Sequence, residues 1–286
     1  MADKSSIVSQ LNISGKRLSK SHRKIAAFIE ENYDKAVFMT ASKLGEIVDV
    51  SESTVVRFAI ACGHQGYPQL QRSLKEIVRH RLTPAQRFAL SSSLSQDDLP
   101  GAILSNDMRN IKATIEQLDM AQFYQVVDEM SRAKSLYILG LRSAAPLAQF
   151  LHYYLLYIFD DVRLMNNTTN DVFEVMARAK PGDVLVAISF PRYSNRTLEA
   201  MTFASSRGLK VIGITDGKLS PLHEVSDHCL DARTDMTSFV DSLAAPLSLI
   251  NGLIAALGAR NREALKTNFS ELEEVWDTYR VYAGKE

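Results

Sequence analysis

The alternation of strand and helix patterns after residue 101 constrains the fold of this chain more than any other feature. Five short apolar runs have the composition of buried strands: 135–141, 162–165, 183–189, 210–215 and 228–232. Helical periodicity falls before, between and after them, near residues 102–131, 143–159, 170–179, 197–207, 238–258 and 260–282. Such alternation is typical of a doubly wound α/β fold, a parallel sheet with helices on both faces. Ligands of these sheets bind at the carboxyl ends of the strands.

The segment before this region predicts a separate, all-α domain. Its apolar spacing indicates helices at residues 18–32, 41–49, 51–62 and 67–81. Thr40 and Ser51 are suited to cap the second and third helices, and we expect Leu44, Ile47 and Val48 to face inward. Only about two residues separate these two helices, which is tight enough for a helix-turn-helix.

The third helix carries chemistry that suits DNA. Small hydroxyls at its start allow close approach to phosphates or base edges, and an arginine one turn later can reach phosphate or guanine. The candidate DNA-binding residues are Lys43, Ser51, Ser53, Thr54 and Arg57. A plain three-helix bundle has the same spacing and is the alternative.

The charge distribution supports the DNA interpretation. The whole chain has 33 basic and 33 acidic residues, so its formal net charge is zero. Residues 1–90 hold 14 Lys and Arg against 8 Asp and Glu, a balance of +6, and the remainder carries −6. Such asymmetry indicates a polyanion-binding module joined to another domain, although a solvated basic surface would look the same. We expect a DNA-binding domain at 1–82, a linker at 83–101 and a ligand-binding domain at 102–286.

The remaining composition indicates a cytoplasmic protein. No apolar secretory segment is found near the N-terminus, and the apolar stretches 151–159 and 243–257 are short for a membrane span. Cys62 and Cys229 form no close pair, as expected of reduced thiols. No metal-ligand spacing appears, so we expect no metal and no cofactor.

Two predicted strand ends are chemically distinctive. The first strand ends in Gly-Leu-Arg-Ser at 140–143, and the third opens into a helix through SFPRYSNRT at 189–197. Hydroxyls, guanidinium groups and a helix N-terminus together suit a phosphate. The candidate ligand-binding residues are Arg142, Ser143, Ser189, Arg192, Ser194, Asn195 and Thr197. Two alternatives stay open: Ser194 is only a helix cap, or Arg142 and Arg192 clamp a carboxylate.

These segments resemble one family. Residues 40–70, with SESTVVRF followed by a G-x-x-G-Y turn, resemble the helix-turn-helix of RpiR/MurR transcriptional regulators. Residues 135–233 resemble the sugar isomerase (SIS) domain of those regulators. The resemblance implies a regulator of carbohydrate genes that binds an operator in double-stranded DNA and whose SIS domain binds a sugar phosphate. It also implies a homodimer or homotetramer.

The resemblance carries over residue by residue. Ser51, Ser53, Thr54 and Arg57 occupy recognition-helix positions. Ser194 and Thr197 match the phosphate-cradle residues if the loop is aligned from its helix, and Ser189 matches if it is aligned from the strand.

The first ligand loop departs from the family pattern. SIS domains often carry Gly-x-Gly-x-Ser there, and this chain has Arg142 at the second glycine, Ala144 at the serine and Ser143 one place earlier.

SIS folds also serve isomerases, which need a general base near the sugar. The available bases are His152, His223, His228, Glu199 and Glu224, and none lies in a recognisable catalytic motif. We therefore expect a sensor with no catalytic residues. The alternative is a sugar-phosphate isomerase with an appended helical domain.

Overall fold

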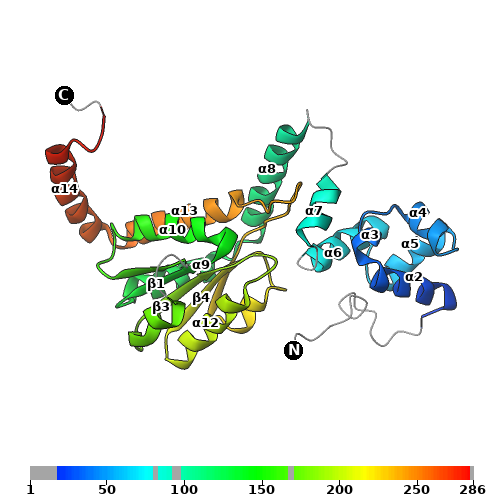
Figure 1. Cartoon of the computed structure of the whole chain (residues 1–286), viewed down its shortest axis with the longest axis horizontal. Coiled ribbons are helices and arrows are strands. Elements are labelled where there is room, and N and C mark those ends of the chain that lie inside the picture. The colour runs from blue at the N-terminus through cyan, green and yellow to red at the C-terminus, as the bar shows by residue number, and fades with distance from the viewer. Residues whose placement is uncertain (1–17, 80–82, 92–97, 167–170, 284–286) are drawn as a thin grey trace. The chain divides into compact units, whose positions relative to one another are not determined.

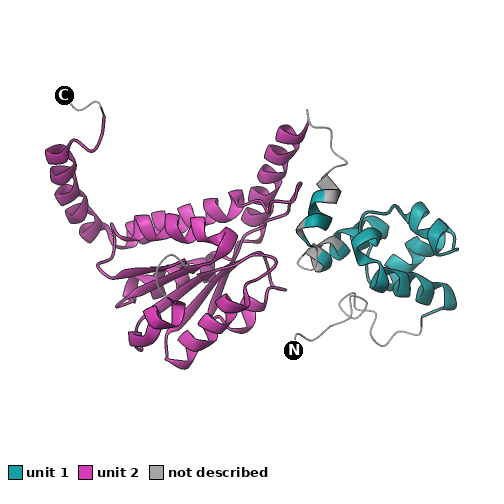
Figure 2. Cartoon of the chain, in the orientation of Figure 1, with its two compact units in different colours: residues 1–93 teal, residues 94–286 magenta. Residues whose placement is uncertain are grey.

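The computed structural model describes residues 18–79, 83–91, 98–166 and 171–283, and the chain divides into two compact units, residues 1–93 and 94–286 (Figure 2). The expected domain bounds, with a linker at 83–101, stay a prediction. Residues 92–97 of that linker lie outside the described residues, while helix α7 (Pro84–Ser91) and the start of helix α8 (Leu99–Gln117) fall within it. None of the described helices is long and apolar enough to cross a membrane.

Unit 1 is helical, as predicted. Its other helices are α2 (Lys20–Glu31), α3 (Tyr33–Ala36), α4 (Ala41–Ile47), α5 (Glu52–Ala61) and α6 (Tyr67–Arg79). Ile25, Leu44, Phe58 and Leu70 are fully buried, so α2, α4, α5 and α6 share one small core. The sequence spacing predicted this core because these residues recur on one face of each helix.

The turn between α4 and α5 is longer than expected. It spans Val48–Ser51, and Asp49 adopts a left-handed backbone with φ 55°. A Cβ at Gly45 would lie 2.7 Å from the carbonyl oxygen of Val50, so only glycine lets the turn pack this closely. The prediction that Ile47 faces inward is wrong: it is 43% exposed. Gly45 faces the core, and Ile47, two residues on, points to the opposite side of the helix.

Unit 2 contains the predicted parallel sheet. The strands are β1 (Leu136–Gly140), β2 (Val162–Met165), β3 (Val184–Ile188), β4 (Lys210–Thr215) and β5 (His228–Asp231). They lie in the order β2-β1-β3-β4-β5, and every neighbouring pair is parallel. The helices are α8 (Leu99–Gln117), α9 (Met120–Arg132), α10 (Ala145–Leu155), α11 (Val172–Val175), α12 (Asn195–Ser206), α13 (Ala244–Arg260) and α14 (Arg262–Tyr279). The doubly wound α/β class is therefore confirmed.

Helices cover both faces of this sheet, with α10 and α13 on one side and α12 on the other (Figure 1). Leu136 and Ile138 of β1 pack in the core that also contains residues of α9, α10 and α13. The alternate residues Tyr137 and Leu139 pack in the second core, with residues of α11 and α12. This alternation follows from the two-residue period of a strand, and it explains why both sides of each strand are apolar.

Three helix bounds differ from the prediction. The segment 102–131 forms two helices because Asp119 caps α9, accepting hydrogen bonds from the N–H groups of Ala121 and Gln122. The segment 170–179 gives one α-helical turn followed by the 3-10 turn η2 (Met176–Arg178). Helix α13 begins at Ala244 rather than near 238, and the residues between β5 and α13 form a crossover with neither helix nor strand.

Candidate functional site

The first candidate site is the exposed start of α5. The Ser51 hydroxyl accepts a hydrogen bond from the N–H of Thr54 and lies 2.9 Å from Ser53 Oγ and 2.8 Å from Thr54 Oγ1. Arg57 donates from Nε to the carbonyl of Ser53 and from its terminal nitrogen to Thr54 Oγ1, both at 3.3 Å. The structure therefore brings four of the five predicted DNA-binding side chains into one cluster of donors.

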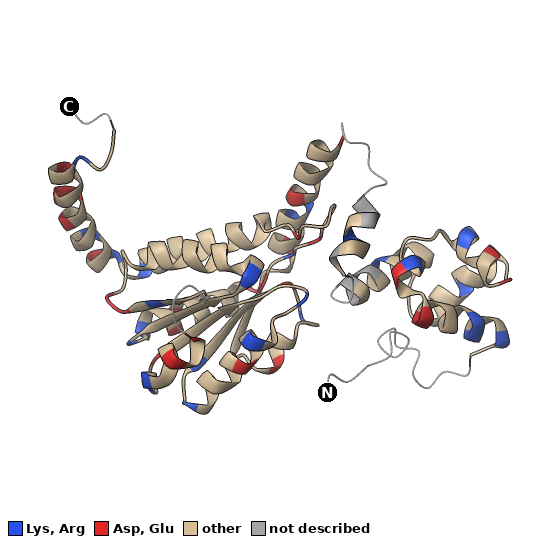
Figure 3. Ribbon diagram, in the orientation of Figure 1, with Lys and Arg blue, Asp and Glu red and all other residues tan. Residues whose placement is uncertain are grey.

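Lys43 lies on the preceding helix, outside that cluster. Its Nζ pairs with Glu46 Oε2 at 2.9 Å, and both side chains are well exposed. Such surface pairs contribute little, so the ammonium is free to exchange onto a phosphate. Lys and Arg residues are spread over the helices of unit 1 (Figure 3).

Sequence reasoning missed Ile60, which is 55% exposed on α5, one turn after Arg57. An apolar side chain there suits contact with a thymine methyl group. Its place off the buried stripe of Val55, Phe58 and Ala59 was the signal that could have identified it.

The second candidate site is the carboxyl edge of the sheet at β1 and β3. These strands are neighbours, with Gly140 opposite Ile188 in the register. From here the chain passes to β2 on one side and to β4 on the other, which is the switch point where open α/β sheets bind ligands. The two loops predicted to bind the ligand therefore start side by side.

The β1 loop is shaped by two backbone features. A Cβ at Gly140 would lie 2.5 Å from Ala148 Cβ and 2.7 Å from the carbonyl oxygen of Ala144, so glycine is required for α10 to approach the strand. Arg142 has φ 56° in the 3-10 turn η1 (Arg142–Ala144), and Ser143 beside it is exposed. The left-handed backbone explains the glycine that SIS domains often carry at this position. Holding arginine there costs about 1–2 kcal/mol.

The β3 loop leads into the N-terminus of α12, where two hydroxyl side chains are not engaged as helix caps or hydrogen-bond donors among the described residues. Ser194 is the N-cap of α12, but its side chain makes no capping hydrogen bond. Asn195 is exposed as the first residue of α12. Thr197, in the first turn, is 0% exposed, and its Oγ1 has no hydrogen-bond partner among the described residues. Ser189 is buried directly after the strand, and its N–H donates to the carbonyl of Ile214 at 3.1 Å.

The polar N-cap side chains of the described helices fall into two groups. The oxygens of Ser19, Thr40, Ser51, Asp119, Asp171 and Ser220 accept a hydrogen bond from a backbone N–H. The side chains of Asn32, Asp98, Asn261 and Ser194 make no capping hydrogen bond, which leaves the Ser194 hydroxyl available to a ligand.

The other arginines of the β3 loop have distinct environments. Arg192 is exposed with φ 69°, a second left-handed arginine, and neither it nor Arg142 forms an ion pair with a described residue. Arg196 is instead engaged by Asp171 and lies 4.3 Å above the Phe173 ring. The backbone N–H of Phe173 and the Arg196 guanidinium lower the pKa of Asp171. Arg196 therefore ties α12 to α11.

The sequence did not reveal what anchors this loop. The hydroxyl of Tyr193 donates to Asp216 Oδ1 at 2.7 Å, which joins the β3 loop to the end of β4. Thr215 Oγ1 donates to Ser220 Oγ at 2.7 Å in the next turn. These contacts couple two neighbouring loops at the carboxyl edge.

The candidate bases are mostly engaged. His152 Nε2 lies 3.3 Å from the Val162 carbonyl, and Glu199 pairs with Arg196 at 3.6 Å. His223 Nε2 lies 2.9 Å from Asp231 Oδ1, at the end of β5. Within the described ranges, no group of three His, Cys, Asp or Glu side chains is placed to hold a metal ion.

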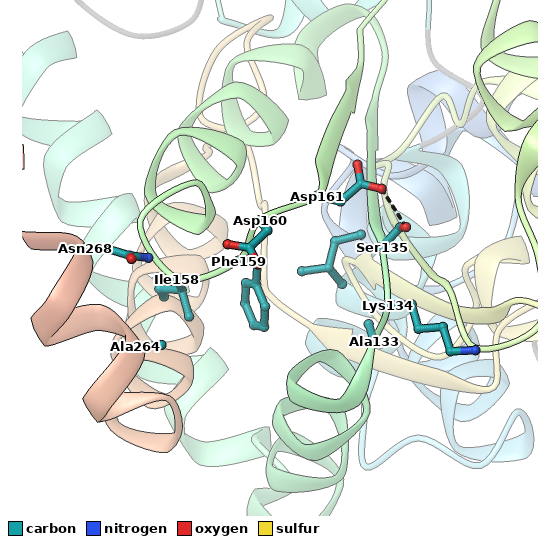
Figure 4. A pocket seen from close by; sticks show the side chains of 10 residues that line it. Ala133, Lys134, Ser135, Ile158, Phe159, Asp160, Asp161, Ala264 and Asn268 are labelled. Atoms are coloured by element: carbon teal, nitrogen blue, oxygen red, sulfur yellow. Dashed lines mark hydrogen bonds between the residues drawn. The ribbon is translucent and has the colours of Figure 1, made fainter. Parts of the chain in front are cut away.

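Two cavities lie outside the predicted loops. One of about 210 Å3 opens at the amino edge of the sheet, where Ser135 Oγ donates to Asp161 Oδ2 at 2.7 Å (Figure 4). Ligands of open α/β sheets bind at the opposite edge. The other, of about 440 Å3, lies between α8 and the crossover that follows β5.

Comparison with known proteins agrees with this architecture. Residues 5–80 match the helix-turn-helix domain of the rpiR family, and residues 129–256 match the SIS domain. The Vibrio vulnificus NanR protein, solved in complex with ManNAc-6P, is similar over 97% of this chain and 100% of its own, with 21% identity and a TM-score of 0.60. The sugar isomerase domain of an RpiR transcription factor from Sphaerobacter thermophilus covers 62% of this chain and 99% of its own, with 24% identity and a TM-score of 0.59.

The fold and the two domain matches define a class: a DNA-binding transcriptional regulator with a helix-turn-helix before a SIS domain. The chain belongs to the RpiR family of transcriptional regulators. Because these two solved structures are only 24% and 21% identical to this chain, their similarity shows its fold and nothing further.

Proposed function

We propose that this regulator binds its operator through α4 and α5, and that a sugar phosphate bound at the ends of β1 and β3 changes its affinity for DNA. Lys43, Ser51, Ser53, Thr54 and Arg57 contact the operator. The protein acts in the cytoplasm as a homodimer or homotetramer, controls genes of carbohydrate metabolism and catalyses no reaction. An effector can change the affinity for DNA only if it binds the DNA-bound and the DNA-free arrangement of the protein with different affinities.

The buried, unpartnered hydroxyl of Thr197 carries this proposal. A polar atom without a partner in a protein interior costs about 1–3 kcal/mol, so it requires an explanation. Together with the unused Ser194 side chain and the N–H groups of α12, it supplies the donors that a phosphate accepts. This arrangement supports aligning the second ligand loop from its helix, with Ser194 and Thr197 in the phosphate cradle.

Arg142, Ser143, Ser189, Arg192 and Asn195 complete the proposed ligand site. The guanidinium groups of Arg142 and Arg192, which form no ion pair with a described residue, suit either the phosphate or a carboxylate of the same molecule. Phosphorylated sugar acids therefore belong in the set of effectors to be tested, beside neutral sugar phosphates and unphosphorylated sugar acids.

Fluorescence anisotropy with DNA from the region upstream of the gene tests the proposal. We expect binding that weakens steeply with salt, because phosphate contacts release counterions. We also expect one class of sugar phosphate to shift the binding curve. If the folded protein fails to bind this DNA at low salt, the proposed operator binding is excluded. If none of the tested sugar phosphates and sugar acids shifts the binding curve, the proposed control by an effector is excluded.

The His223–Asp231 pair gives the isomerase alternative a specific basis. A carboxylate that orients an imidazole is a common general-base arrangement, and the 2.9 Å contact lies at the ligand-binding edge. NMR of sugar phosphates incubated with the protein decides between the two functions. Conversion of aldose to ketose at a rate that His223→Gln abolishes would establish the enzyme, and we expect no conversion.

A further inference from the structure

Helix α8 buries polar residues and exposes apolar ones. Its buried residues are Asn106, Asn110 and Thr114, which lie four positions apart and so form one stripe along the helix. A helix on the surface of a globular domain normally turns its apolar face to the core. The outward face of α8 therefore needs a separate explanation.

The polar stripe is firmly attached to unit 2. The side-chain amides of Asn106 and Asn110 both donate to the carbonyl of Asp235, and the N–H of Arg233 donates to Thr114 Oγ1 at 2.9 Å. The helix also packs against α13. These contacts settle which side of α8 faces its own domain.

The opposite side carries an unpaired apolar seam. Leu104, Met108 and Ile115 are 65%, 66% and 68% exposed, and Ile111 between them is half-buried. The spacing of four, three and four residues is the heptad repeat with which helices pair side by side. A helix of another molecule therefore fits this seam better than a loop or a strand does.

The charges beside the seam indicate a second copy of this chain. Asp107 borders the seam on one side and Lys112 on the other. Asp107 Oδ1 accepts a hydrogen bond from Ser242 Oγ at 2.6 Å, which leaves its second oxygen for a partner, and Lys112 Nζ lies 3.9 Å from the exposed Glu116. In a parallel pair of identical helices, these two positions face each other across the interface, and the symmetry axis repeats the contact. Each α8 would thus offer its partner both an apolar seam and a complementary charge.

We propose that two copies of the chain associate through parallel pairing of their α8 helices, with Leu104, Met108, Ile111 and Ile115 in the seam. The inference rests on the homo-oligomer of the proposed function and names its surface and the direction of pairing; its tests need neither operator nor effector. A parallel pair also starts both helices at the same end, which suits dimers that read two half-sites.

Cysteine cross-linking tests the pairing and its direction. In a parallel pair each seam residue meets its own copy, so Met108→Cys should form an intermolecular disulfide under mild oxidation. Arg109→Cys, exposed on the same helix but outside the seam, is the matched control and should stay uncrosslinked. The native Cys62 and Cys229 are buried and should not interfere. Cross-linking of Arg109→Cys in place of Met108→Cys would overturn the proposal.

Sedimentation equilibrium gives an independent test. Met108→Glu puts a charge on an exposed position, so the fold should persist by circular dichroism while the mass of the assembly falls by half. Helix α14 is the competing surface, because none of its residues is buried, and Tyr279→Glu on it should leave the mass unchanged. The proposal fails if the unsubstituted chain is monomeric, if Met108→Glu keeps its mass, or if only Tyr279→Glu dissociates.

Discussion

Asn110 and Asp235 exchange two hydrogen bonds although 125 residues separate them in the sequence. The side-chain amide of Asn110 donates to the carbonyl of Asp235 at 2.9 Å, and the N–H of Asp235 donates to Asn110 Oδ1 at 3.3 Å. The asparagine thus supplies the donor and acceptor that a neighbouring strand would supply. It holds the crossover after β5 against α8.

Loss of this pairing should destabilise unit 2. Asn110→Ala leaves the N–H of Asp235 without its partner, and we expect the free energy of unfolding to fall by about 1–3 kcal/mol. Urea denaturation followed by circular dichroism measures the change. Gln117→Ala, at the end of the same helix and exposed, should change it by less than about 0.5 kcal/mol. Equal effects of the two substitutions would contradict the assigned role of Asn110.

Arg57 should carry much of the specific operator affinity. Its guanidinium lies over the first turn of α5, within reach of a base edge or a phosphate. Arg57→Ala should weaken specific binding by about tenfold to a hundredfold or abolish it. A bidentate contact to guanine contributes about 1–3 kcal/mol, which corresponds to such a loss. Anisotropy titrations measure this change, with Arg178→Ala in unit 2 as a control of equal charge loss. If Arg57→Ala binds the operator with unchanged affinity, Arg57 does not contribute to the DNA interface.

Thr197 and Ser194 should affect the effector response and not the DNA affinity. Thr197→Val deletes a buried hydroxyl that has no partner, so the free protein should be as stable as before or slightly more stable. Its affinity for the effector should fall by about tenfold or more, because a hydrogen bond to a charged phosphate contributes about 1.5–3 kcal/mol.

Ser194→Ala should likewise weaken the effect of the effector on DNA affinity, while operator binding without effector stays unchanged. Titration of effector into the protein–DNA complex measures both properties in one experiment. A normal response in Ser194→Ala and Thr197→Val would mean that Ser189, the alternative alignment, contacts the phosphate.

Two substitutions at Arg142 separate the effect of its backbone strain from the effect of its charge. Arg142→Gly removes both the side chain and the left-handed strain, so the free energy of unfolding should rise by about 1 kcal/mol. Arg142→Ala removes the charge and keeps the strain, so its stability should stay near that of the unsubstituted chain. Thermal denaturation compares the two, and both should bind the effector more weakly. Equal stabilities of the two variants would show that the arginine backbone is not strained.

Cys229 should resist alkylation in the folded protein. Burial raises the pKa of its thiol to about 11, so at pH 8 only about one molecule in a thousand carries the reactive thiolate. Since a raised pKa favours the protonated form, reactivity should increase only as the pH rises toward 11. Mass spectrometry after iodoacetamide treatment measures this, with the exposed thiol of Arg109→Cys as the reactive control. Rapid modification of Cys229 at pH 8 would contradict its buried position.

The strand and helix periods predicted the fold class because they report directly on burial. Leu136, Tyr137, Ile138 and Leu139 are all apolar since β1 is covered on both faces, and this pattern is readable without coordinates. The caps Thr40 and Ser51 were predictable for a similar reason, because they act on N–H groups three residues away.

The predictions that were wrong concerned features that depend on contacts beyond the local sequence pattern. Ile47 lies on an apolar stretch, but only the approach of Gly45 to Val50 decides which side of α4 faces inward. The split between α8 and α9 came from one capping aspartate inside a periodic helical pattern.

The sequence by itself determined the order of domains, the class of each and the residues that gather at the recognition helix and at two strand ends. Those properties follow from local periodicity and from the rule that parallel strands end at one edge. Only the tertiary structure decided that Thr197 is buried without a partner, that Tyr193 anchors its loop to Asp216, and that α8 exposes its apolar seam. Burial and hydrogen bonding between distant segments depend on how the elements pack, and no local pattern encodes that packing.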